Sequence, residues 1–299
     1  MILLPLIIVF IVIMLVIYRN QKLDEAFNET EYARITNKTR RETFADKGSR
    51  GEYSLYAKAS QTLEGETHWL FNVYIPLDNG KTTEIDAILF HASGIYVIES
   101  KNYSGWIFGT ETQEKWTQCL KPSRYVKVQK YQFYNPIKQN QFHINRYRQW
   151  LGESGQNVPI YSVILFGDGC TLRDVKLTSC DHYVDKQSNF PNILRSIAYS
   201  SHYSNIQQVN RIYSKTYRLS QITEETKQKH AQDVRTAQQT KEYACHTAAE
   251  SSSIKASETC PLCKGKLVVR IARRGPNQGH SFMGCSNYPN CRYTRNIDE

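Results

Sequence analysis

Four of the eight cysteines stand in two close pairs near the C-terminus, Cys260 with Cys263 and Cys285 with Cys291. The two pairs are separated by 21 residues. Tetrahedral zinc binding needs this pattern, because each pair supplies two thiolates and one ion closes the loop between them. A unit of about 40 residues also buries too little apolar surface to fold without such a staple. The sequence therefore predicts one structural Zn²⁺ in a small C-terminal domain, residues 259–299. Two disulfides or unrelated free thiols are the alternatives.

The opposite end of the chain begins with an apolar run, MILLPLIIVFIVIMLVI, that contains no charged residue. With Tyr18 the run nearly reaches the length of helix that crosses a hydrocarbon core of ~30 Å. A cleavable signal peptide would need a basic segment before the run and a small-residue cleavage site after it, and both are missing. A buried core helix is the other alternative. We therefore expect a transmembrane anchor over residues 1–18.

The charges beside this run predict its orientation. Arg19 and Lys22 follow it, so the positive-inside rule predicts a single-pass membrane protein with its N-terminus outside and its body in the cytoplasm. In a reducing cytoplasm, spaced cysteines bind metal more often than they form disulfides. The predicted topology therefore agrees with the predicted zinc site.

Between these ends, the chain divides by composition into three segments. Residues 19–47 are polar and helix-prone, which predicts a helical stalk. Residues 48–200 contain strand-like runs that are rich in β-branched and aromatic residues, and helical patterns over 136–150 and 189–200. Asn79-Gly80 marks a hairpin between two of the strand-like runs. Residues 201–258 carry a further short helical pattern at 205–217, then few large apolar residues and a serine run, which predicts a helical spacer and flexible linker. We expect an α/β domain in the middle segment.

Charged residues interrupt two otherwise apolar strands of this domain. Asp86 stands within EIDAILF, and Glu99 and Lys101 end GIYVIESK, where the strand period of two places them on one face. A charge on a buried strand is costly unless it is paired or bound to metal. Carboxylates from neighbouring strands, Asp86 and Glu99, could hold Mg²⁺, and Lys101 could orient or help deprotonate an attacking water. A salt bridge without catalysis is the alternative.

The same stretch resembles the nuclease-related domain (NERD), a branch of the PD-(D/E)xK nuclease superfamily. The match covers roughly residues 48–165 and rests on Gly51-Glu52, IDA at 85–87, GIYVIESKN at 94–102 and NPIKQNQFH at 135–143. The literal Pro-Asp of the motif is missing. The resemblance implies a restriction-endonuclease-like mixed sheet flanked by helices and catalysis with Mg²⁺ or Mn²⁺. The catalytic residues that it implies are Asp86, Glu99, Lys101, Glu52 and Gln139.

Gln139 belongs to a second part of this resemblance. Gln139 and His143 stand at i and i+4, so they share one face of the predicted helix. They resemble the QxxxY helix of some relatives, with His143 in place of the tyrosine.

The C-terminal tail resembles the C4 zinc ribbons of type IA DNA topoisomerases. It shares CPxC, a basic Leu-Val-x-Arg strand and F-x-G-C-S-N-Y-P-x-C-x-Y with them, which implies binding of single-stranded DNA. Seven basic residues against two acids over 260–299, with aromatics among them, agree with that implication, because phosphates attract cations and unpaired bases stack on rings. The predicted nucleic-acid-binding residues are Lys264, Lys266, Arg270, Arg273, Arg274, Phe282, Tyr288, Arg292 and Tyr293.

The formal net charge of +10 favours a polyanionic partner for the whole chain. We expect a membrane-anchored, Mg²⁺-dependent nuclease acting on DNA, single-stranded or branched, that the ribbon captures. Topoisomerase activity is not expected, because the cleavage domains of those enzymes would not fit in 299 residues. A non-catalytic protein that tethers DNA to the membrane on a nuclease-like scaffold is the alternative. Binding of anionic lipid is less favoured, because juxtamembrane charge alone would serve it.

Overall fold

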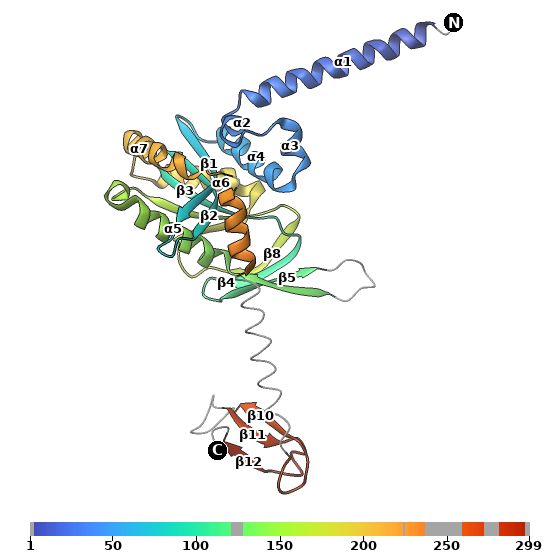
Figure 1. Ribbon diagram of the computed structural model, residues 1–299, viewed down its shortest axis with the longest axis vertical. Coiled ribbons are helices and arrows are strands. Elements are labelled where there is room, and N and C mark those ends of the chain that lie inside the picture. Colours follow the sequence, from blue (N-terminus) through green and yellow to red (C-terminus); the bar gives the residue numbers. More distant parts are fainter. Residues whose placement is uncertain (1–2, 121–127, 224, 237–258, 272–280, 297–299) are drawn as a thin grey trace. The chain divides into compact units, whose positions relative to one another are not determined.

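The computed structural model describes residues 3–120, 128–223, 225–236, 259–271 and 281–296 (Figure 1). The chain forms two compact units, Met1–Lys227 and Gln228–Glu299. The first unit contains the candidate nuclease residues, and the second contains the four paired cysteines.

A five-stranded mixed sheet is the centre of the first unit, with strand order β1-β2-β3-β7-β9. Its strands are β1 (Thr67–Pro76), β2 (Thr82–His91), β3 (Gly94–Lys101), β7 (Ile160–Phe166) and β9 (His182–Lys186). The first three are antiparallel neighbours, whereas β7 and β9 run parallel to β3. Gly80 has φ +74° in the β1–β2 turn, which is the left-handed conformation that the predicted Asn-Gly hairpin requires.

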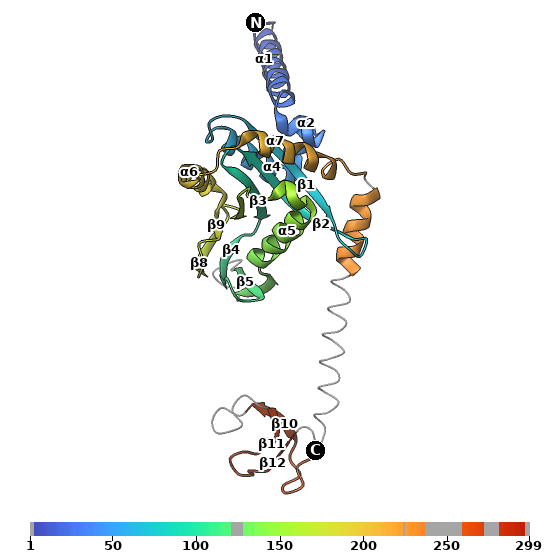
Figure 2. The same ribbon diagram turned by 90° about the vertical axis from the view of Figure 1, so that its left-hand side faces the viewer.

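Helices cover both faces of this sheet. On one face, α4 (Lys47–Ser60) and α6 (Phe190–Ser200) pack on a core that includes Trp69, Leu89 and Ile98. On the other face, α5 (Pro136–Leu151) and α7 (Ile206–Thr216) pack on a core that includes Leu70, Ile88 and Val97, and α5 can be followed along the strands in Figure 2. The predicted mixed sheet flanked by helices is therefore confirmed, and so are the three helices predicted after residue 135.

A second sheet follows β3 in the chain, with strand order β6-β5-β4-β8. Its strands are β4 (Gly105–Thr110), β5 (Lys115–Leu120), β6 (Gln129–Tyr134) and β8 (Cys170–Lys176). One face packs on Phe166 and Ile137 through Ile107 and Trp116, which are fully buried. This sheet is therefore tied to β7 and α5 of the main domain by a shared apolar core.

The N-terminal helices differ from the predicted stalk. They are α1 (Leu3–Asn28), α2 (Glu31–Thr36) and α3 (Arg40–Ala45). Short 3₁₀ turns are found only later in the described chain, as η1 (Gly152–Gly155), η2 (Gln187–Asn189) and η3 (Tyr217–Leu219). Residues 19–47 are helical as predicted, but Phe27 and Tyr32 are buried in the same core as α4 and α6. Burial of these large aromatic side chains makes the segment part of the α/β domain rather than a free stalk.

The predicted transmembrane anchor is not supported. Within the part of the chain that the structure describes, no helix is both long enough and apolar enough to span a bilayer. The side chains of residues 1–6 of the predicted span lie outside that part.

The second unit carries a three-stranded antiparallel sheet of order β10-β11-β12, formed by β10 (Leu267–Ile271), β11 (Ser281–Cys285) and β12 (Thr294–Asn296). Its small core consists of Leu267, Met283 and three of the four paired cysteines. Residues 237–258 of the predicted spacer and linker lie outside the described residues.

Candidate active site and metal centre

Asp86 and Glu99 occupy neighbouring positions on adjacent strands. The antiparallel pairing of β2 with β3 ends at Ala87–Ile98, so Asp86 and Glu99 are the next residues of the two strands. Asp86 Oδ2 accepts a hydrogen bond from the backbone N–H of Ser100 at 2.8 Å. Glu99 is 1% exposed, and Asp86 is partly exposed. The fold therefore brings together the two carboxylates that the sequence predicted.

Lys101 lies on the same face as Glu99, as the strand period predicted. Its Nζ is 2.5 Å from Glu99 Oε1 and donates a hydrogen bond to Gln139 Oε1 at 3.1 Å. Gln139 reaches the site from the first half of α5, which begins at an Asn135 cap with Pro136 in its first turn. The structure thus joins four of the five predicted catalytic residues, Asp86, Glu99, Lys101 and Gln139, in one cluster.

His143, one turn after Gln139, faces the other oxygen of Glu99. Its Nε2 is 3.5 Å from Glu99 Oε2, and its Nδ1 is 2.9 Å from Thr83 Oγ1. Within the described residues, neither Glu99 Oε2 nor His143 Nε2 has a hydrogen-bond partner, although both atoms are buried. Buried carboxylate oxygens are usually hydrogen-bonded, and the His143 ring at 3.5 Å makes only a long contact, so Glu99 Oε2 can accept a further ligand.

Two buried polar residues of this cluster were missed by the sequence analysis. Thr83 contacts His143, and Asn140 Nδ2 donates to Val97 O and Ser162 Oγ, both at 3.0 Å. Asn140 thereby fixes α5 against β3 and β7. Asn140 is fully buried, and a buried asparagine needs hydrogen-bond partners. An asparagine on the buried face of the predicted helix was therefore the available signal, but the sequence alone does not identify its partners.

The charges of this cluster are unevenly balanced. Burial, reinforced by Glu99, raises the pKa of Asp86 to about 8. Burial alone would raise the pKa of Glu99 too, but His143 and Lys101 outweigh it and lower that pKa below its usual range. Burial alone would lower the pKa of Lys101, but the Glu99 carboxylate outweighs it and raises that pKa. Lys101 is therefore an ammonium paired with Glu99, and Asp86 lacks a full counter-charge.

Glu52 lies beside this cluster rather than in it. On α4, it accepts hydrogen bonds from Tyr32 OH at 3.2 Å and Asn72 Nδ2 at 3.4 Å, and Lys38 Nζ is 3.9 Å away. Asn72 lies on β1 between the residues that pair with Ala87 and Ile85 of β2. Burial raises the pKa of Glu52, against the opposing effect of Lys38. The fifth predicted catalytic residue thus contacts Tyr32, Asn72 and Lys38 rather than the other four.

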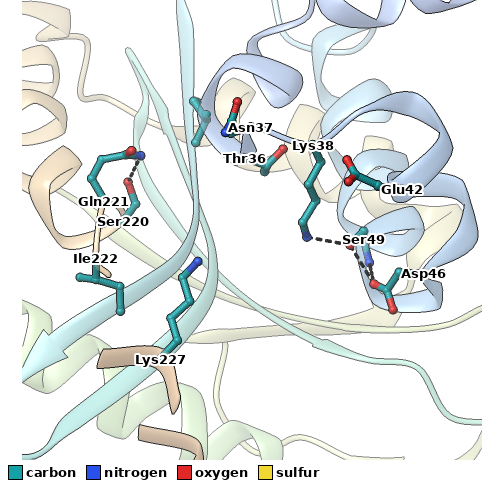
Figure 3. Close-up of a pocket in the computed structure, with 11 residues that line it drawn as sticks. Thr36, Asn37, Lys38, Glu42, Asp46, Ser49, Ser220, Gln221, Ile222 and Lys227 are labelled. Atoms are coloured by element: carbon teal, nitrogen blue, oxygen red, sulfur yellow. Dashed lines mark hydrogen bonds between the residues drawn. The ribbon is translucent and has the colours of Figure 1, made fainter. Parts of the chain in front are cut away.

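A polar hollow of about 670 Å³ opens on the Glu52 side of the domain, between α2, α3, the start of α4 and residues 220–227 (Figure 3). Lys38 and Lys227 extend into it from opposite walls, and Lys38 Nζ donates to Ser49 Oγ at 2.7 Å. A smaller hollow of about 280 Å³ shares Lys38 and Lys227 and reaches Asn72. Two residues that contact Glu52, Lys38 and Asn72, therefore line these hollows.

The four paired cysteines form the metal centre that the sequence predicted. Their Sγ atoms all lie within 4.8 Å of one another, with Cys260 and Cys291 at 3.7 Å and Cys263 and Cys285 at 3.3 Å. Sulfur atoms around tetrahedral zinc are about 3.8 Å apart for Zn–S bonds of ~2.3 Å, and a disulfide bond would be ~2.0 Å. One structural Zn²⁺ fits this set.

Among the described residues, these cysteines are the only group of three or more Cys, His, Asp or Glu side chains with ligand atoms that close together. Asp86, Glu99 and Glu52 do not form such a cluster. The remaining described cysteines are isolated thiols, with Cys119 and Cys170 buried and Cys180 exposed, and Cys245 lies outside the described residues.

Cations and rings gather on one side of the C-terminal unit. A hollow of about 240 Å³ is lined by five of the predicted nucleic-acid-binding residues, Arg270, Phe282, Tyr288, Arg292 and Tyr293. The Arg270 guanidinium lies 5.5 Å from the centre of the Tyr288 ring. Gly284 leaves room for it, because an added Cβ would meet Arg270 Cδ at 3.0 Å. Lys264 and Lys266 are exposed, and Arg273 and Arg274 lie outside the described residues.

The fold and these two centres define the class of protein. It combines an α/β nuclease-like domain, carrying an acid–acid–lysine cluster on adjacent strands, with a four-cysteine ribbon. Family models agree: the nuclease-related domain (NERD) matches residues 47–167, and the topoisomerase DNA-binding C4 zinc finger matches residues 257–299. The chain belongs to the nuclease-related domain family, with a topoisomerase-type zinc ribbon at its C-terminus.

Three individual proteins are similar to parts of this chain. An uncharacterized protein of Bacillus anthracis is 31% identical over 189 residues, which cover 62% of this chain and 82% of that protein. The uncharacterized protein YrdD of Escherichia coli K12 is 42% identical over 43 residues, 14% of this chain and 21% of YrdD. DNA topoisomerase 1 of Campylobacter jejuni is 38% identical over 50 residues, 17% of this chain and 6% of the topoisomerase. No solved structure matches the chain.

Proposed function

We propose that this protein is a DNA nuclease that hydrolyses phosphodiester bonds with a divalent metal ion, Mg²⁺ or Mn²⁺. One observation carries the proposal: Asp86 and Glu99 lie side by side on adjacent strands, and Lys101 alone does not offset their charge. Burial, reinforced by the neighbouring Glu99 carboxylate, raises the pKa of Asp86 to about 8. A divalent cation would supply the missing charge and would favour the ionised form of Asp86.

Asp86 and Glu99 are the residues that would hold the metal. Glu99 Oε2 has no hydrogen-bond partner within the described residues, and carboxylate oxygens are the ligands that Mg²⁺ and Mn²⁺ prefer. When bound, such an ion polarises a phosphoryl oxygen and lowers the pKa of a coordinated water. The oxygen donors of the site therefore fit the ion that the family implies.

Lys101 acts in this proposal as a cation rather than as a base. Its raised pKa keeps it protonated at neutral pH, while Glu99 and Gln139 hold its Nζ in place. A fixed ammonium beside the scissile phosphate would stabilise the negative charge that develops as the P–O bond breaks. It would also orient the attacking water by donating a hydrogen bond to it.

The zinc ribbon supplies DNA binding in the proposal. Its cations attract the phosphate backbone, and its exposed rings offer stacking surfaces that sequence-independent binding of single strands requires. Capture by a second module raises the local concentration of DNA near the nuclease site. We accordingly favour single-stranded or branched DNA as the substrate.

Cleavage by the purified full-length chain tests the proposal. We expect nicking or degradation of single-stranded DNA with Mg²⁺ or Mn²⁺, and at least a ~100-fold loss in Asp86→Ala and Lys101→Ala, because each removes a charge on which the transition state depends. Asp78→Asn and Lys81→Ala are matched controls, since both residues lie in the exposed β1–β2 turn. They should cleave at the wild-type rate.

Two results would contradict the proposed site or activity. Cleavage that persists in both site variants would place the chemistry elsewhere. A wild-type chain that binds DNA but neither cleaves it nor binds Mg²⁺ or Mn²⁺ in calorimetry would instead identify a non-catalytic DNA-binding protein on a nuclease-like scaffold.

A further inference from the structure

The second sheet has an outer face that its apolar core leaves open. Ile107, Trp116, Phe133 and Leu172 point inward to the core that the sheet shares with β7 and α5. The residues that alternate with them must point away from that core. The register sets Trp106 beside Cys119 and Lys130, Phe108 beside Thr117 and Gln132, and Lys115 beside Tyr134 on this outer face.

Cations prevail on this outer face. Lys115, Lys130, Arg173 and Lys176 belong to it. Among the described residues of its four strands, Asp174 is the single acid, and it pairs with Lys176 at 3.6 Å. All four cations are exposed. A polyanion is therefore the complementary partner, and a neutral or basic protein surface is not.

Aromatic rings stand among these cations. Tyr134 is 48% exposed, and Trp106 and Phe108 are partly exposed, although large rings of this kind are usually buried. Arg173 is the extra residue of a bulge in the β4–β8 pair, and its guanidinium lies 4.8 Å from the centre of the Trp106 ring. Rings and cations interleaved on an open sheet form a surface on which unpaired bases stack while phosphates meet basic side chains.

The outer face follows the candidate active site directly in the chain. Lys101 ends β3 and Gly105 begins β4, so at most about 14 Å of chain separates them. The backbone N–H of Gly167, at the end of β7, donates to Lys101 O at 2.9 Å, which fixes this junction to the central sheet. A strand lying on the outer face would thus be near the candidate nuclease residues.

We propose that the outer face of the β6-β5-β4-β8 sheet binds single-stranded DNA, with bases on Tyr134, Phe108 and Trp106 and phosphates against Lys115, Lys130 and Arg173. Duplex DNA does not fit as well, because its bases are already stacked and offer no free ring faces. The inference rests on the proposed function for its ligand. It adds a second DNA-binding surface, separate from the ribbon.

Binding measurements on the full-length chain test this face. Fluorescence anisotropy with a labelled thymidine 30-mer, without added Mg²⁺ or Mn²⁺ and with zinc retained, isolates binding from cleavage. In Lys115→Glu/Lys130→Glu, we expect affinity to fall about tenfold or more. The slope of log K against log salt should decrease by about 1.4, because two phosphate contacts are lost at ~0.7 each for a single strand. The double variant Lys47→Glu/Arg211→Glu, with equal charge reversal at exposed positions elsewhere, should bind as wild type.

A second variant separates stacking from charge. Tyr134→Leu keeps an apolar side chain on an exposed strand position, so the fold should persist. We expect affinity to fall about fivefold with an unchanged salt slope, since stacking involves no ion release. Photocrosslinking of an oligonucleotide with 5-iodouracil should label peptides from residues 105–110 and 128–134.

Unchanged affinity in both variants, or crosslinks confined to the ribbon, would overturn the inference. It would also be overturned if Lys115→Glu/Lys130→Glu changed the oligomeric state rather than DNA binding, because the face would then join copies of the chain. A chain that binds through this face but cleaves nothing refutes only the proposed function. A chain that cleaves while both variants bind normally refutes only this inference.

Discussion

At the scale of single residues, strand periodicity predicted which charged groups share a face. Glu99 and Lys101 needed only a period of two, and their contact at 2.5 Å follows from it. His143 was different: helical spacing placed it near Gln139, but its partner Thr83 is 60 positions away in the sequence. Contacts over such separations depend on the register between α5 and β2, which local patterns do not encode.

The raised pKa of Asp86 gives a stability prediction at this scale. The folded-state pKa of about 8 exceeds the ordinary value of 3.8, so the stability contributed by the bound proton is full below about pH 3.8 and is lost as pH rises through 8. Asp86→Asn keeps an acceptor for the Ser100 N–H and carries no charge. Without divalent metal, we expect it to raise the free energy of unfolding by up to about 6 kcal/mol at pH 9 and by no more than about 2 kcal/mol at pH 5, at about 1.36 kcal/mol per pKa unit.

Urea unfolding followed by tryptophan fluorescence measures this difference. All four tryptophans, Trp69, Trp106, Trp116 and Trp150, belong to the first unit, so the signal reports on that unit alone. Asp78→Asn, in the exposed β1–β2 turn, should show no such pH-dependent gain. Equal stability of wild type and Asp86→Asn at pH 9 would mean that Asp86 is ionised without penalty in the folded protein.

At the scale of elements, helices and strands with strong local signals were predicted, and those that depend on a neighbour were not. The Asn135 cap and Pro136 mark the start of α5 in the sequence, whereas the exposed strand β8 is polar and forms through its pairing with β4. The ribbon is the clearest case of local encoding, because two cysteine pairs specify a complete metal-binding unit.

The ribbon should depend on zinc, since its core contains little beyond Leu267, Met283 and the cysteines. Removal of zinc, or Cys285→Ser, should abolish the ordered NMR signals of residues 259–271 and 281–296 and weaken DNA binding. The tryptophan-detected unfolding of the first unit should not change. Cys180→Ser, which removes an exposed isolated thiol, is the matched control. A ribbon that stayed folded without metal would contradict structural zinc binding.

At the scale of the whole molecule, two compact units divide the proposed work between catalysis and DNA capture. Arg270→Ala/Arg292→Ala should therefore raise KM for DNA about tenfold or more while leaving kcat at saturating DNA unchanged, because in the proposal the ribbon binds DNA and supplies no group to the reacting phosphate. Steady-state kinetics on single-stranded DNA measure the two constants. Lys229→Ala/Arg235→Ala removes two cations from the same unit outside the ribbon and should have little effect. A fall in kcat would show that the ribbon takes part in catalysis.

The sequence by itself determined the zinc centre, the mixed α/β domain and the acidic strand residues, because each depends on residues close together in the chain. Only the tertiary structure decided that residues 19–47 pack onto the domain and that Glu52 contacts Asn72 rather than Asp86. It also decided that His143 faces Glu99 and that basic and aromatic residues share the outer face of the second sheet. Those features arise from packing and strand register between distant segments, where burial of side chains such as Tyr32 and Asn140 fixes one arrangement.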